Sequence, residues 1–344
     1  MSVPSTSDMV PISFFTQQSV EDHGLEKAFT LLYNRYKDRL TSLPKEKGWF
    51  TETLYLYQGF WLERVRVTSV VTVMASQDSF QAQPTDIYLA TLQKSGTTWI
   101  KALAFAIVNR TTYKTNSLST HPLQILNPHR CVPMVETEAL FPVPTYVNGH
   151  LPRLFSTHMP YTSLPQSILD SRCRIVYTCR NPKDVLVSLF HYANRLRDKS
   201  LGLMTFEEAF EMFRKGLIPF GPYWDHVKGY YMAALERPSE ILFLTYENMQ
   251  KDTVNNVKRL AEFLGYPFTE EEEAEGEVHK IVKLCSFETL KEVNKHGMVG
   301  AGFPNDVFFR NGKIGDWTNH LTNEMSKILD QLTKEKFDGL DISF

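Results

Sequence analysis

Polar and basic side chains follow apolar stretches of this sequence at positions where strands are expected to end. The first case is residues 93–98, Gln-Lys-Ser-Gly-Thr-Thr, which come after the apolar run 87–92 and before a helical pattern that begins at Trp99. A strand, a short glycine-containing turn and a helix N-terminus direct backbone N–H groups at an anion, and Lys94 adds a positive charge. These residues therefore predict an anion-binding loop. The ATP-loop pattern G-x-x-x-x-G-K-[ST] is not met, because the lysine precedes the glycine.

A histidine follows the next strand-like stretch, Leu-Phe-Ser-Thr at residues 154–157. In open α/β sheets ligands bind outside the carboxyl ends of the strands, so His158 is expected to face the same crevice as Lys94. An imidazole whose pKa lies near neutrality can remove a proton from a hydroxyl group. His158 is therefore a candidate general base, and a purely structural histidine is the alternative when this residue is taken alone.

Arg180 follows a third apolar stretch, residues 174–179, and precedes a helix with Pro182 near its first position. Its planar guanidinium can hold a phosphate through two hydrogen bonds, and Ser188 lies about a turn and a half into the helix, within reach of the same group. A solvent-exposed loop arginine is the alternative for this position. The stretch therefore indicates a second anion contact in the crevice.

A basic, glycine-containing loop lies near the C-terminal end, at residues 308–317. Its two glycines stand three residues apart, and Arg310 and Lys313 lie before and between them. Such a loop can close on a phosphate, although a lone G-x-x-G pattern is weak evidence.

The elements that must position these residues alternate along the chain. Apolar strand-like runs are interleaved with helical patterns, as in a parallel sheet covered by helices. Strands are predicted at residues 87–91, 154–157, 174–179 and 241–244. The sequence thus predicts an α/β fold, in which a single domain at residues 26–344 contains a central parallel sheet flanked by helices, after a loose tail at residues 1–25.

Three helices carry their own start and stop signals. Thr205 with Glu208 has the spacing of a capping box, and Gly216 follows that helical pattern. Residues 252–265 contain one apolar face that Gly265 ends, and Thr269 begins a further helix with an acidic first turn.

Composition excludes several classes of function. The 344 residues carry a net charge of −2, so no overall positive charge attracts nucleic acid. The four cysteines form no CxxC pair and lie at no zinc-finger spacing from a histidine, so no metal site is expected. The longest apolar-looking run, residues 65–75, is too short and too polar to cross a bilayer, and the N-terminus lacks a signal-peptide pattern. We expect a soluble, cytoplasmic protein that binds neither nucleic acid nor membrane.

Taken together, KSGTTW (94–99), CRNPKDVLVSLFHY (179–192) and RNGKIGDW (310–317) resemble motifs of the cytosolic sulfotransferase family, and most closely its plant branch. The stretches GPYWDHVKGYY, LFLTYENM and CSFETLKE match further landmarks, and the resemblance covers residues 43–337. It implies a sulfotransferase fold with a P-loop-like nucleotide site. It also implies metal-independent transfer of a sulfuryl group from 3′-phosphoadenosine 5′-phosphosulfate (PAPS) to a hydroxyl, with 3′-phosphoadenosine 5′-phosphate (PAP) as product.

The resemblance also implies roles for individual residues. His158 is the base, and Lys94 stabilises the charge on the bridging oxygen and the transferring group. The 5′ end of the donor is surrounded by Ser95, Gly96, Thr97, Thr98 and Trp99, the last against adenine. The 3′-phosphate contacts are Arg180, Ser188, Arg310, Asn311 and Gly312, and the adenosine site contains Tyr246, Ser286 and Phe287. Candidate walls of the acceptor pocket are Phe60, Trp61, Phe141 and Tyr192.

This chain departs from the family pattern at several positions. Leu92-Gln93 replaces Tyr-Pro before the loop lysine, and Asn311 stands where a lysine is frequent. The animal dimer motif K-x-x-x-T-V-x-x-x-E is not matched by the residues after Trp317, so a monomer is expected. The acceptor implied is a small hydroxylated plant hormone or phenolic, of hydroxyjasmonate, salicylate, brassinosteroid or flavonol type.

Two other functions compete with this one. A P-loop kinase or ATPase would need Mg²⁺, the first loop glycine and a strand that ends in an aspartate, and the last two are missing from the sequence. A non-catalytic nucleotide-binding protein is the second alternative, and the presence of both Lys94 and His158 argues against it.

Overall fold

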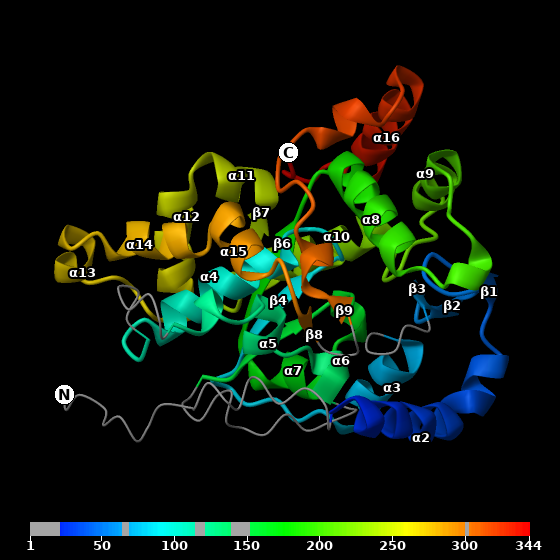
Figure 1. Cartoon of the computed structure of the whole chain (residues 1–344), viewed down its shortest axis with the longest axis horizontal. Coiled ribbons are helices and arrows are strands. Elements are labelled where there is room, and N and C mark those ends of the chain that lie inside the picture. Colours follow the sequence, from blue (N-terminus) through cyan, green and yellow to red (C-terminus); the bar gives the residue numbers. More distant parts are fainter. Residues whose placement is uncertain (1–20, 64–68, 114–120, 139–151, 300–302) are drawn as a thin grey trace.

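Four parallel strands form the central sheet of this chain (Figure 1). The computed structural model describes residues 21–63, 69–113, 121–138, 152–299 and 303–344, and for residues 21–26 it describes only the backbone. The strand order is β5-β4-β6-β7. Ala90 lies opposite Thr157 on one side and Tyr177 on the other, so the strands end at a common edge. All four predicted strands are confirmed, and the last is one residue longer than predicted; the bounds are β4 Ile87–Thr91, β5 Leu154–Thr157, β6 Arg174–Cys179 and β7 Ile241–Thr245.

The sheet separates two apolar clusters because successive side chains of a strand point to opposite faces. Ile87 and Leu89 of β4 belong to one cluster, and Tyr88 and Ala90 belong to the other. Every residue of β4 is buried, which is why this strand reads as a continuous apolar run rather than an alternating one.

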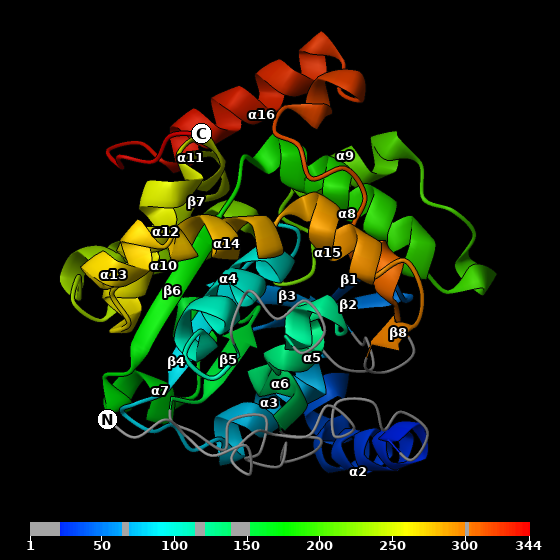
Figure 2. The same cartoon turned by 60° about the vertical axis from the view of Figure 1, so that its left-hand side comes forward.

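Helices cover both faces of the sheet. The cluster that contains Ile87 is completed by α4 (Thr97–Asn109), α12 (Thr253–Leu264) and α14 (Glu277–Leu284). The cluster that contains Tyr88 is completed by α3 (Val70–Ser79), α8 (Pro182–Leu196), α10 (Tyr223–Glu236) and α16 (Asn323–Lys336). Figure 1 shows α4, α12 and α14 on one side of β6 and β7, with α8 and α10 on the other. The central parallel sheet flanked by helices is therefore confirmed, and α16 lies at the rim beside α8 (Figure 2).

The remaining elements lie around this three-layer centre. A small antiparallel sheet contains β1 (Lys45–Lys47), β2 (Thr53–Tyr57) and β3 (Phe60–Glu63), and β8 (Met298–Val299) pairs with β9 (Phe303–Pro304). The other helices are α2 (Glu21–Thr41), α5 (Pro128–Cys131), α6 (Val135–Glu138), α7 (Gln166–Ser171), α9 (Phe206–Arg214), α11 (Tyr246–Lys251), α13 (Glu270–Ala274) and α15 (Phe287–Val293). Short 3₁₀ turns occupy Pro122–Gln124, Tyr161–Ser163, Lys199–Leu201, Asn305–Phe308 and Asp316–Asn319.

The predicted helix signals have clear structural counterparts. α12 begins after Asp252 and ends at Gly265, whose φ of 82° is left-handed. α13 forms a complete capping box between Thr269 and Glu272. In α9 only half of the predicted box is formed, since the Thr205 hydroxyl accepts the N–H of Glu208 without the reciprocal contact from the Glu208 side chain. One boundary differs: residues 21–25, predicted as part of the tail, belong to α2, because the apolar periodicity that reveals a helix starts only later in that segment. Residues 1–20 of the predicted tail lie outside the described part of the chain.

Candidate active site

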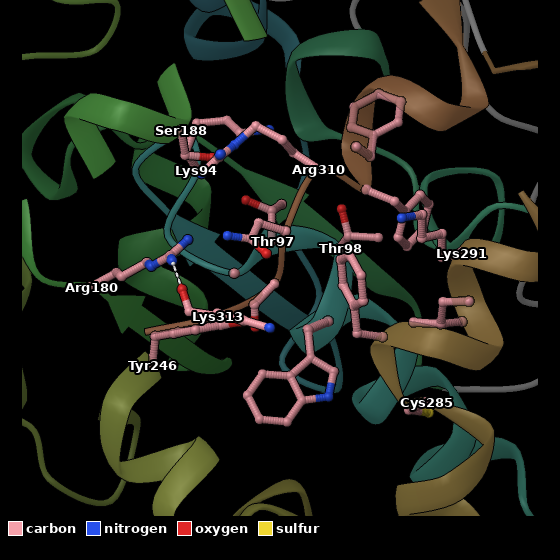
Figure 3. Close-up of a pocket in the computed structure, with 18 of the residues that line it drawn as sticks. Lys94, Thr97, Thr98, Arg180, Ser188, Tyr246, Cys285, Lys291, Arg310 and Lys313 are labelled. Atoms are coloured by element: carbon pink, nitrogen blue, oxygen red, sulfur yellow. Dashed lines mark hydrogen bonds between the residues drawn. The ribbon is translucent and has the colours of Figure 1, made fainter. Parts of the chain in front are cut away.

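A cavity of about 750 Å³ lies at the common carboxyl edge of the four strands. Figure 3 shows the side chains of Lys94, Arg180 and Arg310 around the same space. Almost all residues predicted for the nucleotide site line this cavity: Lys94, Gly96, Thr97, Thr98, Trp99, Arg180, Ser188, Tyr246, Ser286, Phe287, Arg310, Asn311 and Gly312, together with His158. Ser95 lies behind this wall, fully buried.

The loop after β4 uses a backbone that most residues avoid. Lys94 has a φ of 69° and Gly96 a φ of 99°. A Cβ on Gly96 would stand 2.9 Å from Cδ2 of Tyr246, so both backbone conformation and space require glycine there. α4 then begins without a side-chain cap, which leaves its first N–H groups available to an anion. The left-handed lysine is a strained feature of the kind found at functional sites.

The two threonines of the loop point in different directions. The Thr97 hydroxyl lies 2.7 Å from the Thr91 hydroxyl, on the strand side of the loop. The Thr98 hydroxyl lies 3.0 Å from Nε2 of His129. The buried hydroxyl of Ser95 has no hydrogen-bond partner among the described residues.

Lys94 reaches the cavity without a counter-charge. Its Nζ stands 4.1 Å from the centre of the Tyr192 ring, and among the described residues no carboxylate pairs with it. Burial among protein atoms, with a smaller contribution from the positive charges of Arg180 and Arg310, lowers the pKa of this part-exposed ammonium to about 7. An anion placed here would gain an electrostatic partner that no carboxylate of the described residues uses.

His158 is fixed by contacts to its ring and to its backbone. Nδ1 lies 2.7 Å from the carbonyl oxygen of Thr91, and because a carbonyl only accepts, Nδ1 carries the hydrogen and Nε2 is the free base. A carboxylate oxygen of Glu136 accepts the His158 N–H at 2.8 Å, and Nε2 of His226 donates to the His158 carbonyl at 3.0 Å. The ring is thus held with one defined nitrogen available.

Burial lowers the pKa of His158 to about 3. The hydrogen bond to the Thr91 carbonyl acts in the opposite direction, while the charge of Lys101 reinforces the lowering. The imidazole is therefore neutral across the physiological range, in the form that can accept a proton.

Arg180 lies at the opposite side of the cavity. Its NH2 group donates to the carbonyl oxygen of Lys313 at 2.8 Å, shown as the dashed line in Figure 3, and lies 3.7 Å from a carboxylate oxygen of Asp184. The guanidinium stands 4.6 Å from the centre of the Tyr246 ring, and its buried Nε has no partner among the described residues. Of the five N–H donors of this guanidinium, the NH2 group supplies the contacts above, so further donors remain for a ligand.

The C-terminal loop is attached to this side by α8. Asp184 accepts the N–H groups of Gly315 at 2.8 Å and Trp317 at 3.1 Å. Gly312 has a φ of 67°, and a Cβ there would lie 2.4 Å from Cδ2 of Phe287. The loop therefore passes directly over the aromatic residues predicted for the adenosine site.

The residues predicted for the acceptor pocket are only partly brought together. Tyr192 lines the cavity, and Phe60 and Trp61 lie outside its wall. The Phe60 ring is 6.3 Å from the ring of His226, and the Trp61 N–H donates to the Gly221 carbonyl at 2.7 Å in a strand-like bridge. Phe141 falls outside the described residues.

The cavity residues that were not predicted from the sequence include His129 and Gln250, while Gln93, Phe308 and Lys313 belong to the two predicted anion-binding loops without an individual role in the nucleotide site. Gln93 and Lys313 are direct neighbours of predicted residues. His129 is different, because it lies in the four-residue helix α5 rather than after a strand, so the rule that located His158 does not reach it.

The described residues form neither a metal site nor a membrane-spanning helix. The described residues contain no group of three or more His, Cys, Asp or Glu side chains arranged to hold a metal ion, and all four cysteines are free and buried. Within the same ranges, no helix has both the length and the apolar character needed to cross a membrane.

Comparison with known proteins agrees with this geometry. Residues 84–341 match the family model described as the sulfotransferase domain. Cytosolic sulfotransferase 15 of Arabidopsis thaliana is 40% identical over 100% of this chain and 96% of its own length. Flavonol 4′-sulfotransferase of Flaveria chlorifolia is 47% identical over 83% of this chain and 89% of its own length.

A solved structure of a mouse sulfotransferase complexed with PAP is also similar. It is 27% identical, covers 84% of this chain and 95% of its own, and superposes with a TM-score of 0.63. The family match extends over most of the chain and includes the strands, loops and helices that form the cavity. The chain therefore belongs to the plant branch of the cytosolic sulfotransferase family and is a sulfotransferase.

Proposed function

We propose that this chain transfers a sulfuryl group from PAPS to a hydroxyl group of a small aromatic or otherwise hydrophobic acceptor. The observation that carries the proposal is that Lys94, His158 and Arg180 follow three neighbouring parallel strands and line a single cavity. A cation for the reacting end, a neutral base and a second cation for a distant phosphate are the groups that such a transfer needs. The mouse sulfotransferase of similar structure was solved with PAP, which supports the same donor here.

The polar groups of the cavity fit a donor with anionic ends. Arg180 Nε is buried without a partner among the described residues, and Lys94, which lines the cavity, has no carboxylate beside it among them. Unpaired buried donors are costly unless a ligand pairs with them. The volume of about 750 Å³ lies within the range of nucleotide-sized pockets.

Two clusters of residues would hold the nucleotide. The 3′-phosphate would contact Arg180 and Ser188 on one side and the loop residues Arg310, Asn311 and Gly312 on the other. The adenosine would lie among Trp99, Tyr246, Ser286 and Phe287. Trp99 and Tyr246 already meet edge to face, with ring centres 5.5 Å apart, and so form one aromatic platform.

Lys94 and the start of α4 would stabilise the charge that develops during transfer. The donor supplies a sulfuryl group on a phosphate, and transfer breaks one S–O bond as another forms. Negative charge then grows on the oxygen that leaves with the phosphate, where an ammonium and the N–H groups of residues 95–98 are most effective. Positioning and charge neutralisation provide most of the rate in such transfers, as in phosphoryl transfer.

His158 would accept the proton of the acceptor hydroxyl at Nε2. The ring needs no prior deprotonation, because its pKa is lowered to about 3 and the neutral form is always present at physiological pH. A nearby anion favours the charged imidazolium, so the presence of the donor makes this base stronger when the acceptor is also bound.

For the acceptor, we propose a hydroxylated plant metabolite, with a flavonol or a related phenolic first among the hydroxyjasmonate, salicylate, brassinosteroid and flavonol types. A relative named flavonol 4′-sulfotransferase is 47% identical, which supports this choice. Tyr192 and Phe308, with ring centres 5.9 Å apart, offer an aromatic wall inside the cavity. We further propose that the protein acts as a monomer in the cytoplasm, without metal.

A transfer assay with purified protein tests the proposal. The chain is incubated with ³⁵S-labelled PAPS and a panel of hydroxylated plant metabolites in EDTA, and the products are separated. Labelled product in EDTA supports the proposal. PAP binding without any transfer would favour the non-catalytic alternative. A parallel incubation with γ-labelled ATP and Mg²⁺ in place of PAPS and EDTA tests the kinase, which would give labelled product only there.

A further inference from the structure

A buried series of hydrogen bonds connects the inside of α4 to the cavity, and the roles above involve only its last member, Thr98. Thr98 and Lys101 stand three residues apart on α4, so their side chains lie on the same face of the helix. Lys101 is fully buried. Its Nζ lies 3.0 Å from Nδ1 of His129 and 3.0 Å from the carbonyl oxygen of Val132. A buried lysine in so specific a contact calls for a reason beyond packing.

His129 is held rigidly between this lysine and Thr98. Its backbone N–H donates to Oδ1 of Asn127 at 3.0 Å, which caps the short helix α5. Its ring lies 4.3 Å from the ring of Phe308, centre to centre. Its second nitrogen, Nε2, lies 3.0 Å from the Thr98 hydroxyl, so the imidazole bridges Lys101 and a residue of the anion-binding loop.

The direction of each hydrogen bond between Lys101, His129 and Thr98 follows from Lys101, the first residue of the series. An ammonium only donates, so Nδ1 of His129 must accept from Lys101, and the ring hydrogen then lies on Nε2. The Nε2–H therefore donates to Oγ1 of Thr98, and the hydroxyl hydrogen of Thr98 is left for another acceptor.

This direction is strictly required for the charged form of Lys101. Burial lowers the pKa of Lys101 to about 7, and the charge of Glu136 acts in the opposite direction. A neutral amine still has two hydrogens, which can serve the Val132 carbonyl and Nδ1 of His129, so the same tautomer stays compatible with both contacts above that pKa.

We propose that His129, held by Lys101, is a positioning residue that turns the Thr98 hydroxyl into a hydrogen-bond donor toward the anionic 5′ end of the donor nucleotide. This inference rests on the proposed function, since it takes a nucleotide with a 5′-phosphate as the ligand. With the opposite tautomer, Thr98 would donate to His129 and present only lone pairs to the anion. Lys101 thus determines whether the loop attracts or repels the ligand at this point.

The hydrogen bonds from Lys101 through His129 to the Thr98 hydroxyl form a relay, and ligand binding by variants tests it. The ligands are PAP and adenosine 3′-phosphate, which lacks the 5′-phosphate, and the variants are Thr98→Val, His129→Phe and the double variant. A hydrogen bond to a charged group contributes about 1.5 kcal/mol or more, so each single variant should weaken PAP binding roughly tenfold. Adenosine 3′-phosphate should bind all of them as it binds the wild type. The double variant should be no weaker than either single one, because both remove the same contact.

Matched variants separate this role from a structural one. The Thr97 hydroxyl faces Thr91 instead of His129, so the effects of Thr97→Val and His129→Phe on PAP binding should add. His129→Gln keeps an N–H near Thr98 and should retain more affinity than His129→Phe. The tautomer can be read directly by long-range ¹H–¹⁵N spectra of the histidine rings, with the signal assigned by its loss in His129→Phe. Nε2–H is expected in the wild type, and a mixture of tautomers in Lys101→Met.

Three results would each overturn the relay alone: equal weakening of both ligands by His129→Phe, additive effects of Thr98→Val and His129→Phe, or an Nδ1–H tautomer in the wild type. A wild-type protein that bound neither ligand would instead overturn the proposed donor, and the relay with it.

Discussion

The two ends of the cavity hold their charged groups in opposite ways. At the end formed by α8 and the C-terminal loop, Arg180 donates to a backbone carbonyl and stands 3.7 Å from Asp184, and Arg310 forms an ion pair with Asp316. Each guanidinium is permanently charged and already balanced by an acceptor or a carboxylate. The two guanidinium groups at this end therefore stay charged whether or not a ligand is bound.

The end formed by the loop after β4 contains groups whose charged forms are disfavoured. Lys94 lies over an aromatic ring, with no carboxylate beside it among the described residues, and burial lowers its pKa to about 7. His158 has a pKa lowered to about 3, mainly by burial, and burial also lowers the pKa of His129 well below its usual value.

The difference indicates a division of labour within one site. Permanent, balanced cations suit the binding of a group that does not react. Groups whose charge depends on the environment suit a place where charge appears during the reaction, because the ligand or the transition state supplies the missing partner. If this comparison is correct, changes to Lys94 and His158 at the loop end should alter turnover, and changes to the arginines at the α8 end should alter affinity.

The largest effect is expected for His158→Gln and His158→Ala. Removal of the base should lower kcat about 10²- to 10⁴-fold, because proton removal from the acceptor loses its positioned partner. PAP should bind as in the wild type, since the nucleotide does not use the imidazole. Steady-state kinetics and calorimetry with PAP measure the two quantities.

A second buried histidine supplies the control. The ring of His121 accepts the N–H of Leu123 away from the cavity wall, and burial lowers its pKa to about 4, much as for His158. His121→Asn should leave kcat of the folded protein unchanged. A His158 variant that kept more than about a tenth of the wild-type turnover would contradict the general-base role.

Lys94→Met should come next, with kcat about 10²- to 10³-fold lower. The ammonium stabilises charge on the leaving oxygen more in the transition state than in the ground state, so the affinity for PAPS should change little. Lys183→Met is the matched control, because that buried lysine lies over the Trp317 ring outside the cavity. Lost affinity with preserved kcat in Lys94→Met, or loss of wild-type activity in EDTA, would remove Lys94 from the reacting end.

At the α8 end, Arg180→Ala should weaken binding selectively. A charge-assisted contact to the 3′-phosphate contributes about 1.5–3 kcal/mol, which corresponds to roughly 10- to 150-fold in Kd. The affinity for PAP should fall by this factor, whereas the affinity for AMP, which has no 3′-phosphate, should change little. Arg214 forms an exposed ion pair with Glu211, and Arg214→Ala should leave the affinity for both ligands unchanged. Equal weakening of PAP and AMP would place Arg180 away from the 3′-phosphate.

Much of this site was accessible from the sequence because its residues follow strands. The strand pattern is strong where both faces of the sheet are buried, and parallel strands end at one edge. The amino-acid pattern alone is therefore enough to place Lys94, His158 and Arg180 together. The same reasoning located the strands to within one residue.

The rest depended on packing that no local pattern reveals. His129 belongs to a four-residue helix whose place is set by contacts with α4, and only the fold brings its ring between Lys101 and Thr98. Trp61 was expected beside the acceptor, but its strand pairs with Gly221 and lies outside the cavity wall. Short elements fixed by distant partners carry too little periodicity to be placed from sequence.

The smallest expected effect concerns the proton on Lys94, and it tests the comparison most directly. Without ligand its pKa is about 7, below the usual 10.5, so the amine is mostly neutral above pH 7 and mostly charged below it. An anionic ligand favours the charged form and raises this pKa. PAP binding should therefore take up a fraction of a proton at about pH 8.5, and almost none from this group at about pH 6, where Lys94 is already protonated in both states. Calorimetry in buffers of different ionisation enthalpy measures the uptake, and Lys94→Met should remove it at the higher pH. If the wild type and Lys94→Met took up the same number of protons at both pH values, Lys94 would hold its charge as the arginines do, and the two ends of the cavity would not differ in the way described.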